Sequence, residues 1–414
     1  MTPISNSLTP PGQLILGVAR TGAKFTPLNH KPTGDPVFDM ISSGAMIPVT
    51  PDEIRAEMAS LYHAGVRYIH EHARNPATRE QSAEPAIYKS ISAMAREVAP
   101  DALLSFGGSR NGQEIASAIK THGEIARVAH AGLDRDAGGA DFVTTQAAIE
   151  LQIVLDMERQ GFIRIKPQDG SYKVLRPLHT YEPSGTVEEA RLAVNSTAGG
   201  ANYGSSSAWI QYETAKWTID ARERLGLPYE VEWVQEARSA FLTWYLANHM
   251  PEGLRRIGRL NITLLFGFSP RLPFPKSYAA FKRLVEKAKR IANPVWDEET
   301  RPLHVSVSVG CAVLPQHAKD HVLPVDVGPL RGVVLGPLER LAIYAAQPNA
   351  GVDILRVGLE DTPYVLDDTA DLMPTTNLDL VWRTRGILDT HGTKLVTDMD
   401  TLTAFKSVPG GPGQ

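Results

Sequence analysis

The stretch TPDEIRAEMASLYHAGVRYIHEHAR, residues 50–74, contains a helix signal followed directly by a strand signal. Thr50, Pro51 and Glu53 form the pattern of a capping box with proline at the first helical position. Apolar residues then recur at helical spacing up to Gly65, and the closing YIHEHAR is an apolar, strand-like run. A helix that leads the chain into a strand is the unit from which parallel α/β sheets are built.

The same alternation of strand-like and helical patterns continues along the chain. Candidate strands lie at 14–20, 68–74, 102–108, 229–234, 261–268, 304–309 and 354–359. An eighth is expected between 140 and 203, where either 141–145 or 191–197 fits. Further helices are expected at 84–98, 207–225, 235–249, 275–291, 337–346 and 377–390. This pattern predicts an α/β fold, and we favour a (β/α)8 TIM barrel over a doubly wound open sheet.

We expect a single barrel domain over residues 1–414. The spacing after the third strand is about twice that of one βα unit of roughly 30 residues, which predicts an insertion between strands 3 and 4, at approximately 135–186. Two alternating runs around Asp169-Gly170 predict a β-hairpin within this insertion. The proline-rich ends, 1–12 and 408–414, are expected to be loose.

Composition excludes several classes of protein. With 43% hydrophobic and 21% charged residues, the chain has an ordinary globular composition, and a formal net charge of -4 argues against a nucleic-acid partner. Cys311 is the single cysteine, so an intrachain disulfide and the sulfur-rich zinc frameworks are excluded. Because no apolar run is long enough to span a bilayer and the N-terminal segment lacks a signal-peptide pattern, we expect no membrane partner and a cytoplasmic location.

His70 and His72 lie at the C-terminal end of the second candidate strand. Side chains alternate between the two faces of a strand, so both imidazoles point to the same side. The active site of a barrel also forms at the C-terminal ends of its strands. A lone histidine is more often a core or surface residue, whereas a pair in this position indicates metal ligation.

A second polar cluster follows the last candidate strand. Arg356 and Glu360 share one face by the period of two, and Asp361 begins the next loop. The alternative interpretation is a salt bridge of Arg356 with one acid, with Asp361 as a helix N-cap. In a barrel, however, the last strand closes against the first, so Glu360 could meet the two histidines.

Two imidazoles and one carboxylate form the ligand set of an open catalytic zinc site, with a position left for water or a substrate oxygen. Fe²⁺ and Mn²⁺ fit a similar set, and we favour zinc. A metal-dependent hydrolase or aldolase on the same barrel is the alternative enzyme. A third possibility is a non-enzymatic barrel whose metal joins strands or senses a ligand.

The order of motifs in this sequence resembles the β-keto acid cleavage enzyme family, which includes 3-keto-5-aminohexanoate cleavage enzyme. The resemblance extends through most of the chain. The matching motifs are Thr21-Gly22-Ala23, Pro48-Val-Thr-Pro-Asp-Glu-Ile54, His70-x-His72-x-Arg74, Ser105 with Gly107-Gly108, Asn202-Tyr203-Gly204, Tyr229-Glu-Val-Glu232, Arg356-Val-Gly-Leu-Glu-Asp361, and the helix from Thr376-Asn377 to Arg385.

The resemblance implies a (β/α)8 barrel that binds Zn²⁺ through His70, His72 and Glu360. It also implies an acyltransferase that cleaves a carbon–carbon bond: a β-keto acid and acetyl-CoA, as co-substrate, give acetoacetate and a new acyl-CoA. Asp361 corresponds to the base that removes the α-proton, with Arg356 beside it to orient it and keep it ionised. The family forms homo-oligomers.

Two further residues are assigned by the same resemblance. Ser105 matches a serine that contacts substrate or intermediate. Lys24 stands where the aminohexanoate enzyme has an acidic residue, which would suit a substrate ammonium group. We therefore hypothesise that this chain prefers a substrate with a distal carboxylate; the alternative is that Lys24 only neutralises a loop.

Overall fold

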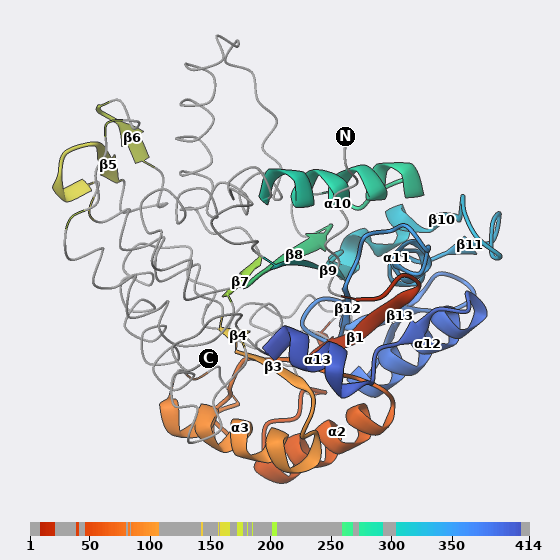
Figure 1. Cartoon of the computed structure of the whole chain (residues 1–414), viewed down its shortest axis with the longest axis horizontal. Helices are drawn as coiled ribbons and strands as arrows, with labels where there is room; N and C mark the ends of the chain where they lie inside the picture. The colour runs from red at the N-terminus through yellow and green to blue at the C-terminus, as the bar shows by residue number, and fades with distance from the viewer. Residues whose placement is uncertain are drawn as a thin grey trace.

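The computed structural model describes the regions of the chain that build the parallel sheet and several of its helices (Figure 1). The described residues are 9–20, 39–40, 46–79, 82, 84–106, 142–143, 156, 158–165, 172–176, 180, 184, 201–204, 259–267, 273–292 and 304–406.

The main sheet consists of parallel strands with one continuous order. Its strands are β1 (Gln13–Ala19), β2 (Tyr68–Glu71), β3 (Leu103–Phe106), β4 (Phe142–Val143), β7 (Ala201–Gly204), β8 (Arg259–Phe266), β9 (His304–Cys311), β12 (Ile354–Val357) and the short β15 (Lys394–Leu395). The order is β12-β9-β8-β7-β4-β3-β2-β1-β15, and β12 pairs with β1 as well as with β9. The first and last long strands of the chain are therefore neighbours, as expected for the site proposed from sequence.

Helices flank this sheet. They are α2 (Pro51–His63), α3 (Pro85–Val98), α10 (Tyr278–Ala292), α11 (Pro337–Ala345), α12 (Asn377–Thr390) and α13 (Met399–Lys406). Figure 1 shows α2 beside α3 and α11 beside α12. An α/β fold with a mostly parallel sheet is thus confirmed. The complete (β/α)8 alternation remains a prediction, because the expected helices 207–225 and 235–249 lie outside the described residues.

The middle of the sheet differs from the sequence prediction. The segment 141–145 contains β4, whereas the alternative at 191–197 lies outside the described residues. Ala201–Gly204, which the sequence pattern did not predict as a strand, forms β7 and pairs with both β4 and β8. The predicted strand 229–234 lies outside the described residues.

The runs on either side of Asp169-Gly170 pair as antiparallel strands β5 (Ile163–Ile165) and β6 (Tyr172–Val174). Because β4 already pairs with β3, this pair follows the fourth strand of the sheet; the prediction that it lies between strands 3 and 4 was wrong. The extent of the inserted segment, 135–186, stays a prediction. Two more antiparallel pairs are described, β10 (Leu323–Pro324) with β11 (Val334–Leu335) and β13 (Tyr364–Leu366) with β14 (Leu372–Pro374), together with a 3-10 helix, η3 (Pro315–His321).

Helix α2 begins where the capping box predicts. The Thr50 hydroxyl accepts a hydrogen bond from the Glu53 N–H at 3.3 Å, and a Glu53 carboxylate oxygen accepts one from the Thr50 N–H at 3.0 Å. After the helix ends, Gly65 adopts a φ of 94°, a left-handed conformation that glycine adopts without strain. The local signals of this segment therefore predicted its structure correctly.

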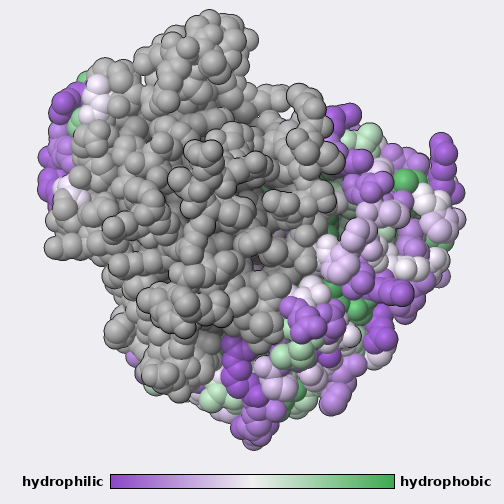
Figure 2. Space-filling model, in the orientation of Figure 1, coloured by the Kyte–Doolittle hydropathy of each residue, from purple (hydrophilic) through white to green (hydrophobic). Residues whose placement is uncertain are grey.

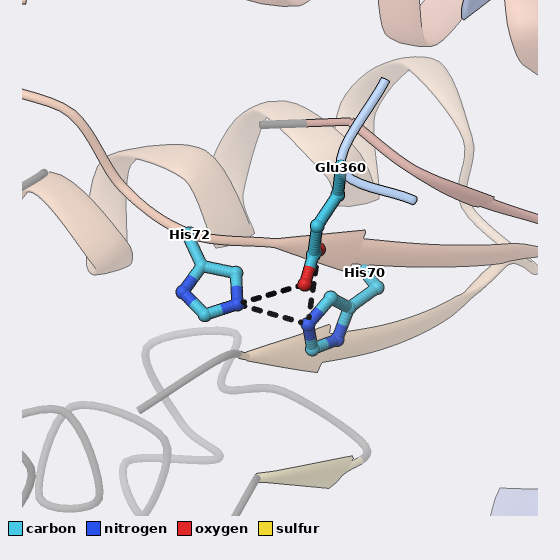
Figure 3. A group of neighbouring side chains, drawn as sticks. All are labelled: His70, His72 and Glu360. Carbon is cyan, nitrogen blue, oxygen red and sulfur yellow. Dashed lines mark hydrogen bonds and ion pairs between the residues drawn. The ribbon is translucent and has the colours of Figure 1, made fainter. Parts of the chain in front are cut away.

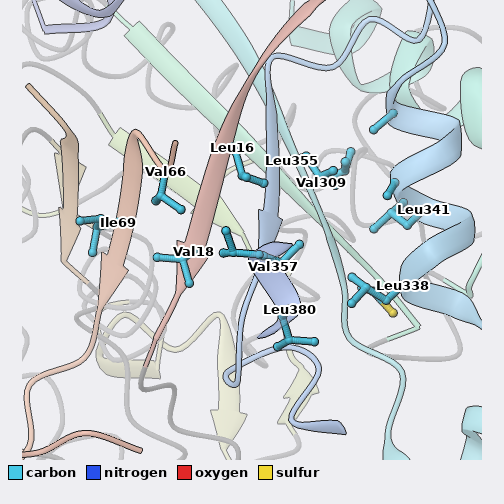
Figure 4. Close-up of a cluster of buried hydrophobic side chains, with 14 of the residues drawn as sticks. Leu16, Val18, Val66, Ile69, Val309, Leu338, Leu341, Leu355, Val357 and Leu380 are labelled. Carbon is cyan, nitrogen blue, oxygen red and sulfur yellow. The ribbon is translucent and has the colours of Figure 1, made fainter. Parts of the chain in front are cut away.

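Two apolar clusters of the described residues pack on the sheet, one on each face. Alternate strand residues Leu16, Val18 and Ile69 belong to the cluster that packs against the helices, which includes Leu341 of α11 and Leu380 of α12 (Figure 4). The intervening residues belong to the second cluster: Ile15, Tyr68, Leu103, Ile354, Val396 and Leu402. Since Leu402 lies on α13, this helix covers the second face near the beginnings of the strands.

Toward the strand ends, the second face becomes polar. The register aligns Ala19 with His70, His70 with Ser105, and Gly17 with Arg356. On their own strands, His70, Ser105 and Arg356 therefore follow Tyr68, Leu103 and Ile354 on the same face. The apolar beginnings of the strands support a buried polar layer at their ends.

The described surface is mainly hydrophilic where Figure 2 shows it. Among the described helices, none is both long enough and apolar enough to cross a membrane.

Asp353 connects three strands at their beginnings. One of its carboxylate oxygens accepts hydrogen bonds from the N–H and hydroxyl of Thr9, at 3.2 and 3.1 Å, and the other accepts one from the Val307 N–H at 2.9 Å. Its own backbone N–H and carbonyl bond to Val307 and Ile15. Thr9 is buried, and the loose end expected at 1–12 stays a prediction.

We expect Asp353→Ala to lower the free energy of unfolding by about 2–4 kcal/mol, because it removes the buried hydrogen bonds that Thr9 and Val307 donate to this carboxylate. Urea unfolding of the variant measures this change. Asp368→Ala, at an exposed position, is the control and should change the stability by less than about 0.5 kcal/mol. Equal stabilities of the two variants would contradict this role for Asp353.

Candidate metal centre

His70, His72 and Glu360 meet at the ends of β2 and β12 (Figure 3). The Nε2 atoms of the two histidines lie 3.1 Å apart. Each Nε2 also faces a different Glu360 oxygen, at 3.5 Å from His70 and 3.6 Å from His72. All three side chains are buried or nearly so. The structure thus brings together the three residues that the sequence suggested as metal ligands.

Glu360 reaches the histidines from a turn, not from a strand. The strand predicted at 354–359 ends at Val357, and Gly358 follows with a φ of 128°. A Cβ atom at position 358 would lie only 2.3 Å from the Ala19 carbonyl oxygen. Glycine therefore allows the turn to pass directly over the end of β1, where the Glu360 N–H donates to the same Ala19 oxygen at 3.1 Å.

Ser105 lies beside His70 on the next strand. Its hydroxyl oxygen is 2.9 Å from Nδ1 of His70, on the side of the ring away from Glu360. A histidine that binds a metal through Nε2 normally donates its Nδ1–H to such a partner. Ser105 therefore has the position to orient the His70 ring, which its sequence assignment as a substrate contact did not include.

The charges around the three residues favour the ligand forms of His70 and Glu360. Burial lowers the pKa of His70 well below its ordinary value, and the positive charge of Arg356 acts in the same direction. Burial alone would raise the pKa of Glu360, but Arg356 and the two imidazoles lower it well below its ordinary range. At neutral pH, His70 is neutral and Glu360 is ionised.

Arg356 connects Glu360 with Asp361. Its guanidinium donates to both oxygens of the Asp361 carboxylate, at 2.7 and 3.0 Å, and lies 3.0 Å from a Glu360 oxygen. Burial disfavours the charge of Arg356, yet the two carboxylates raise its pKa. The predicted neighbours of the histidines are therefore present as one buried charged group.

The donor set fits a divalent cation. Ligands at about 2.0–2.1 Å from a tetrahedral ion are about 3.3–3.4 Å apart, close to the separations of 3.1, 3.5 and 3.6 Å between these donor atoms. Oε2 of Glu360 is buried and accepts no hydrogen bond within the described residues. A cation bound by both imidazoles would compensate that oxygen.

An ion-pair network on the opposite face of β2 was not anticipated. Glu71, between the two histidines, points away from them and accepts a hydrogen bond from Nη1 of Arg20 at 2.6 Å. Nε of Arg20 pairs with Glu57 of α2 at 2.5 Å. Because side chains alternate along β2, Glu71 faces the helices, where a buried acid requires a cationic partner. The position of Glu71 was therefore the sequence signal for this ion pair.

One residue of the expected site falls outside the described residues. Lys24 lies in the segment 21–38, so its assignment stays a prediction.

A cavity of about 660 Å³ lies elsewhere, between the ends of α2 and α12 and the strand β15. Lys394 and Leu395 line it and pair with Gln13 and Leu14, at the beginning of β1. It therefore opens at the end of the sheet opposite the histidines, and we do not assign the substrate to it.

Comparison with known proteins agrees with the sequence resemblance. Residues 32–165 match the family model described as beta-keto acid cleavage enzyme. This segment contains His70, His72 and Ser105. No curated protein matches the chain.

Solved structures show only distant likeness. Apo ObcA is 17% identical, with a TM-score of 0.45 over 87% of this chain and 65% of ObcA, so the chain spans slightly less than two thirds of that protein. ObcA structures with oxaloacetate, and with a C4-CoA adduct and oxalate, are each 18% identical, with TM-scores of 0.46 and 0.45 over 87% of this chain and 67% of theirs. The homocysteine methyltransferase MmuM from Escherichia coli is 11% identical, with a TM-score of 0.35 over 91% of this chain and 96% of MmuM.

Structures with such low identities and TM-scores do not indicate the chemistry of this chain. The resemblance to a family depends on the family match. That match covers the segment with both histidines, and the predicted resemblance is confirmed. Residues 32–165 are therefore similar to the beta-keto acid cleavage enzyme family.

Proposed function

We propose that this chain is a metal-dependent acyltransferase that converts a β-keto acid and acetyl-CoA into acetoacetate and a new acyl-CoA. The observation that carries the proposal is the meeting of His70, His72 and Glu360 beside the buried pair of Arg356 and Asp361. This arrangement combines a ligand set for a divalent cation with a carboxylate base, and the family match supports the β-keto acid as substrate.

His70, His72 and Glu360 would hold the cation, for which we favour Zn²⁺ over Fe²⁺ and Mn²⁺. When bound, it supplies Lewis-acid polarisation of the keto and carboxylate oxygens of the substrate. The chain itself contributes the preorganisation of the site. The hydrogen bond of Ser105 to His70 keeps the ring in place, and Arg356 keeps Glu360 ionised.

Asp361 is the proposed base. It takes the α-proton, and the resulting carbanion attacks the acetyl thioester carbonyl and displaces the coenzyme A thiolate. The thiolate then attacks the original keto carbon; the bond to the α-carbon breaks, acetoacetate leaves after recovering the proton, and the remaining acyl group stays on coenzyme A. The bidentate pairing with Arg356 orients Asp361 but weakens it as a base, so proton transfer requires at least one of these hydrogen bonds to lengthen.

The remaining expectations belong to the same proposal. They are the full (β/α)8 barrel, the contact of Ser105 with substrate, a homo-oligomeric state and a cytoplasmic location.

The first test is metal dependence. We expect purified protein to carry about one divalent cation per chain, and chelation to abolish formation of acetoacetate from acetyl-CoA until Zn²⁺ is restored. Elemental analysis and a coupled activity assay measure both. His72→Ala should lose the metal and at least about 100-fold in activity, whereas His63→Ala, at an exposed position on α2, should resemble the wild type.

Full activity of metal-free protein would contradict the proposed metal. Turnover of the β-keto acid without acetyl-CoA would instead indicate a hydrolase or aldolase.

The second test addresses the base. Asp361→Asn should lower kcat by about 10²–10⁴-fold while metal content is retained, because it removes the proton acceptor and leaves the three ligands. Exchange of the substrate α-protons with deuterated water, above the uncatalysed rate, should fall in parallel. Asp368→Asn, at an exposed position, is the control. Undiminished exchange in Asp361→Asn would assign the base to another group.

The third test addresses substrate choice. If Lys24 faces a distal carboxylate, kcat/KM for 3-oxoadipate should exceed that for 3-keto-5-aminohexanoate, and Lys24→Glu should shift the ratio toward the amino-bearing substrate by about 10-fold or more. A panel of β-keto acids assayed with acetyl-CoA measures these ratios. Equal turnover of both substrates by the wild type would remove support for this role.

A further inference from the structure

The segments that carry the candidate ligands are connected behind the site by one buried side chain, Asn377. This residue is the first of α12 and has no exposed surface. Its Oδ1 accepts a hydrogen bond from the N–H of Leu359 at 2.8 Å. Leu359 directly precedes Glu360, so Asn377 fixes the backbone of the turn from which this carboxylate extends.

The amide nitrogen of Asn377 makes the second connection. It donates to Oε1 of Glu57 at 3.0 Å and to the carbonyl oxygen of Arg20 at 3.3 Å. Arg20 in turn donates its backbone N–H to the His70 carbonyl at 3.1 Å. The amide of Asn377 is thus two hydrogen bonds away from the backbone of His70, in the segment that carries both histidines.

Arg20 strengthens this connection through its side chain. The fully buried guanidinium pairs with Glu71, which lies between His70 and His72, and with Glu57, which Asn377 also contacts. Displacement of Asn377 would therefore disturb Glu57, Arg20 and the histidine strand together. The same displacement would release the Leu359 N–H.

The hydrogen bonds of the Asn377 side chain are not part of the cap of α12. The cap is formed by Thr376 and Asp379: the Thr376 hydroxyl oxygen accepts a hydrogen bond from the Asp379 N–H at 3.1 Å. The Asp379 carboxylate accepts from the hydroxyl and N–H of Thr376 at 2.7 and 3.3 Å. The Asn377 side chain, by contrast, bonds to residues of other elements: Leu359, Arg20 and Glu57.

We propose that Asn377 is a positioning residue of the metal centre, which sets the distance between Glu360 and the pair of His70 and His72. It touches neither the proposed ligand atoms nor the proposed base. The inference rests on the proposed metal site. Residues that hold metal ligands in place typically contribute 10–100-fold to metal affinity or activity.

The experiment compares Asn377→Ala with Asp379→Ala. Both residues lie in the first turn of α12, but Asp379→Ala removes the cap, whereas only Asn377→Ala removes the contacts to Leu359, Arg20 and Glu57. We measure the Kd for Zn²⁺ by competition with a chromophoric chelator, the visible absorption spectrum of the Co²⁺-substituted protein, and Tm. Asn377→Ala should weaken Zn²⁺ binding by about 10–100-fold and change the Co²⁺ spectrum. Asp379→Ala should lower Tm without either effect.

Asn377→Ser, which keeps a small polar residue at the start of the helix, decides the result if the alanine variant does not fold; it should also weaken Zn²⁺ binding. Wild-type affinity and an unchanged Co²⁺ spectrum in the Asn377 variants would overturn the inference alone. Equal losses in Asp379→Ala would overturn it in favour of a merely structural role. A wild-type protein that binds no stoichiometric Zn²⁺ would instead overturn the proposed metal site, and the inference with it.

Discussion

The parallel pairing of β1 with both β2 and β12 is the constraint on which the site depends. It places the end of β2, where the two histidines lie, and the end of β12 on either side of β1. Gly358 then permits the turn after β12 to cross Ala19 at a separation that no side chain allows. Glu360 consequently lies over the histidines, although almost 300 residues separate them along the chain.

Electrostatics inside this layer depends on Arg356. The Arg356 guanidinium pairs with both carboxylates, so Glu360 keeps its negative charge in a buried position and Asp361 is oriented beside it. Removal of Arg356 would leave the charges of Glu360 and Asp361 buried and uncompensated, and removal of both acids would do the same to the charge of Arg356. The divalent cation, if bound, adds positive charge at the Glu360 oxygen that has no hydrogen bond from the described residues. The three ligands and the Arg356–Asp361 pair therefore form one electrostatic unit.

The opposite face of β2 supports the same unit. Glu71 pairs with Arg20 on the side away from the histidines, and Asn377 bonds to both the Arg20 carbonyl and the turn before Glu360. Apolar packing of Val18, Ile69 and Leu380 surrounds this polar network. The hydrogen bonds of Arg20 and Asn377, together with the pairing of β1 with β2 and β12, thus fix the positions of the candidate ligands. A preorganised metal site requires such support.

Local sequence patterns predicted that both histidines point to the same side, that helix α2 begins with a capping box, and that Arg356 lies near Asp361. Those features depend on residues within a few positions of one another. Pairing between distant segments decided the rest: β7, which no sequence pattern indicated, pairs with β8, Glu360 comes from a turn instead of a strand, and Asn377 connects the two segments that carry the ligands. Sequence patterns carry periodicity and capping but not the long-range register that sets these contacts, so only the tertiary structure could establish them.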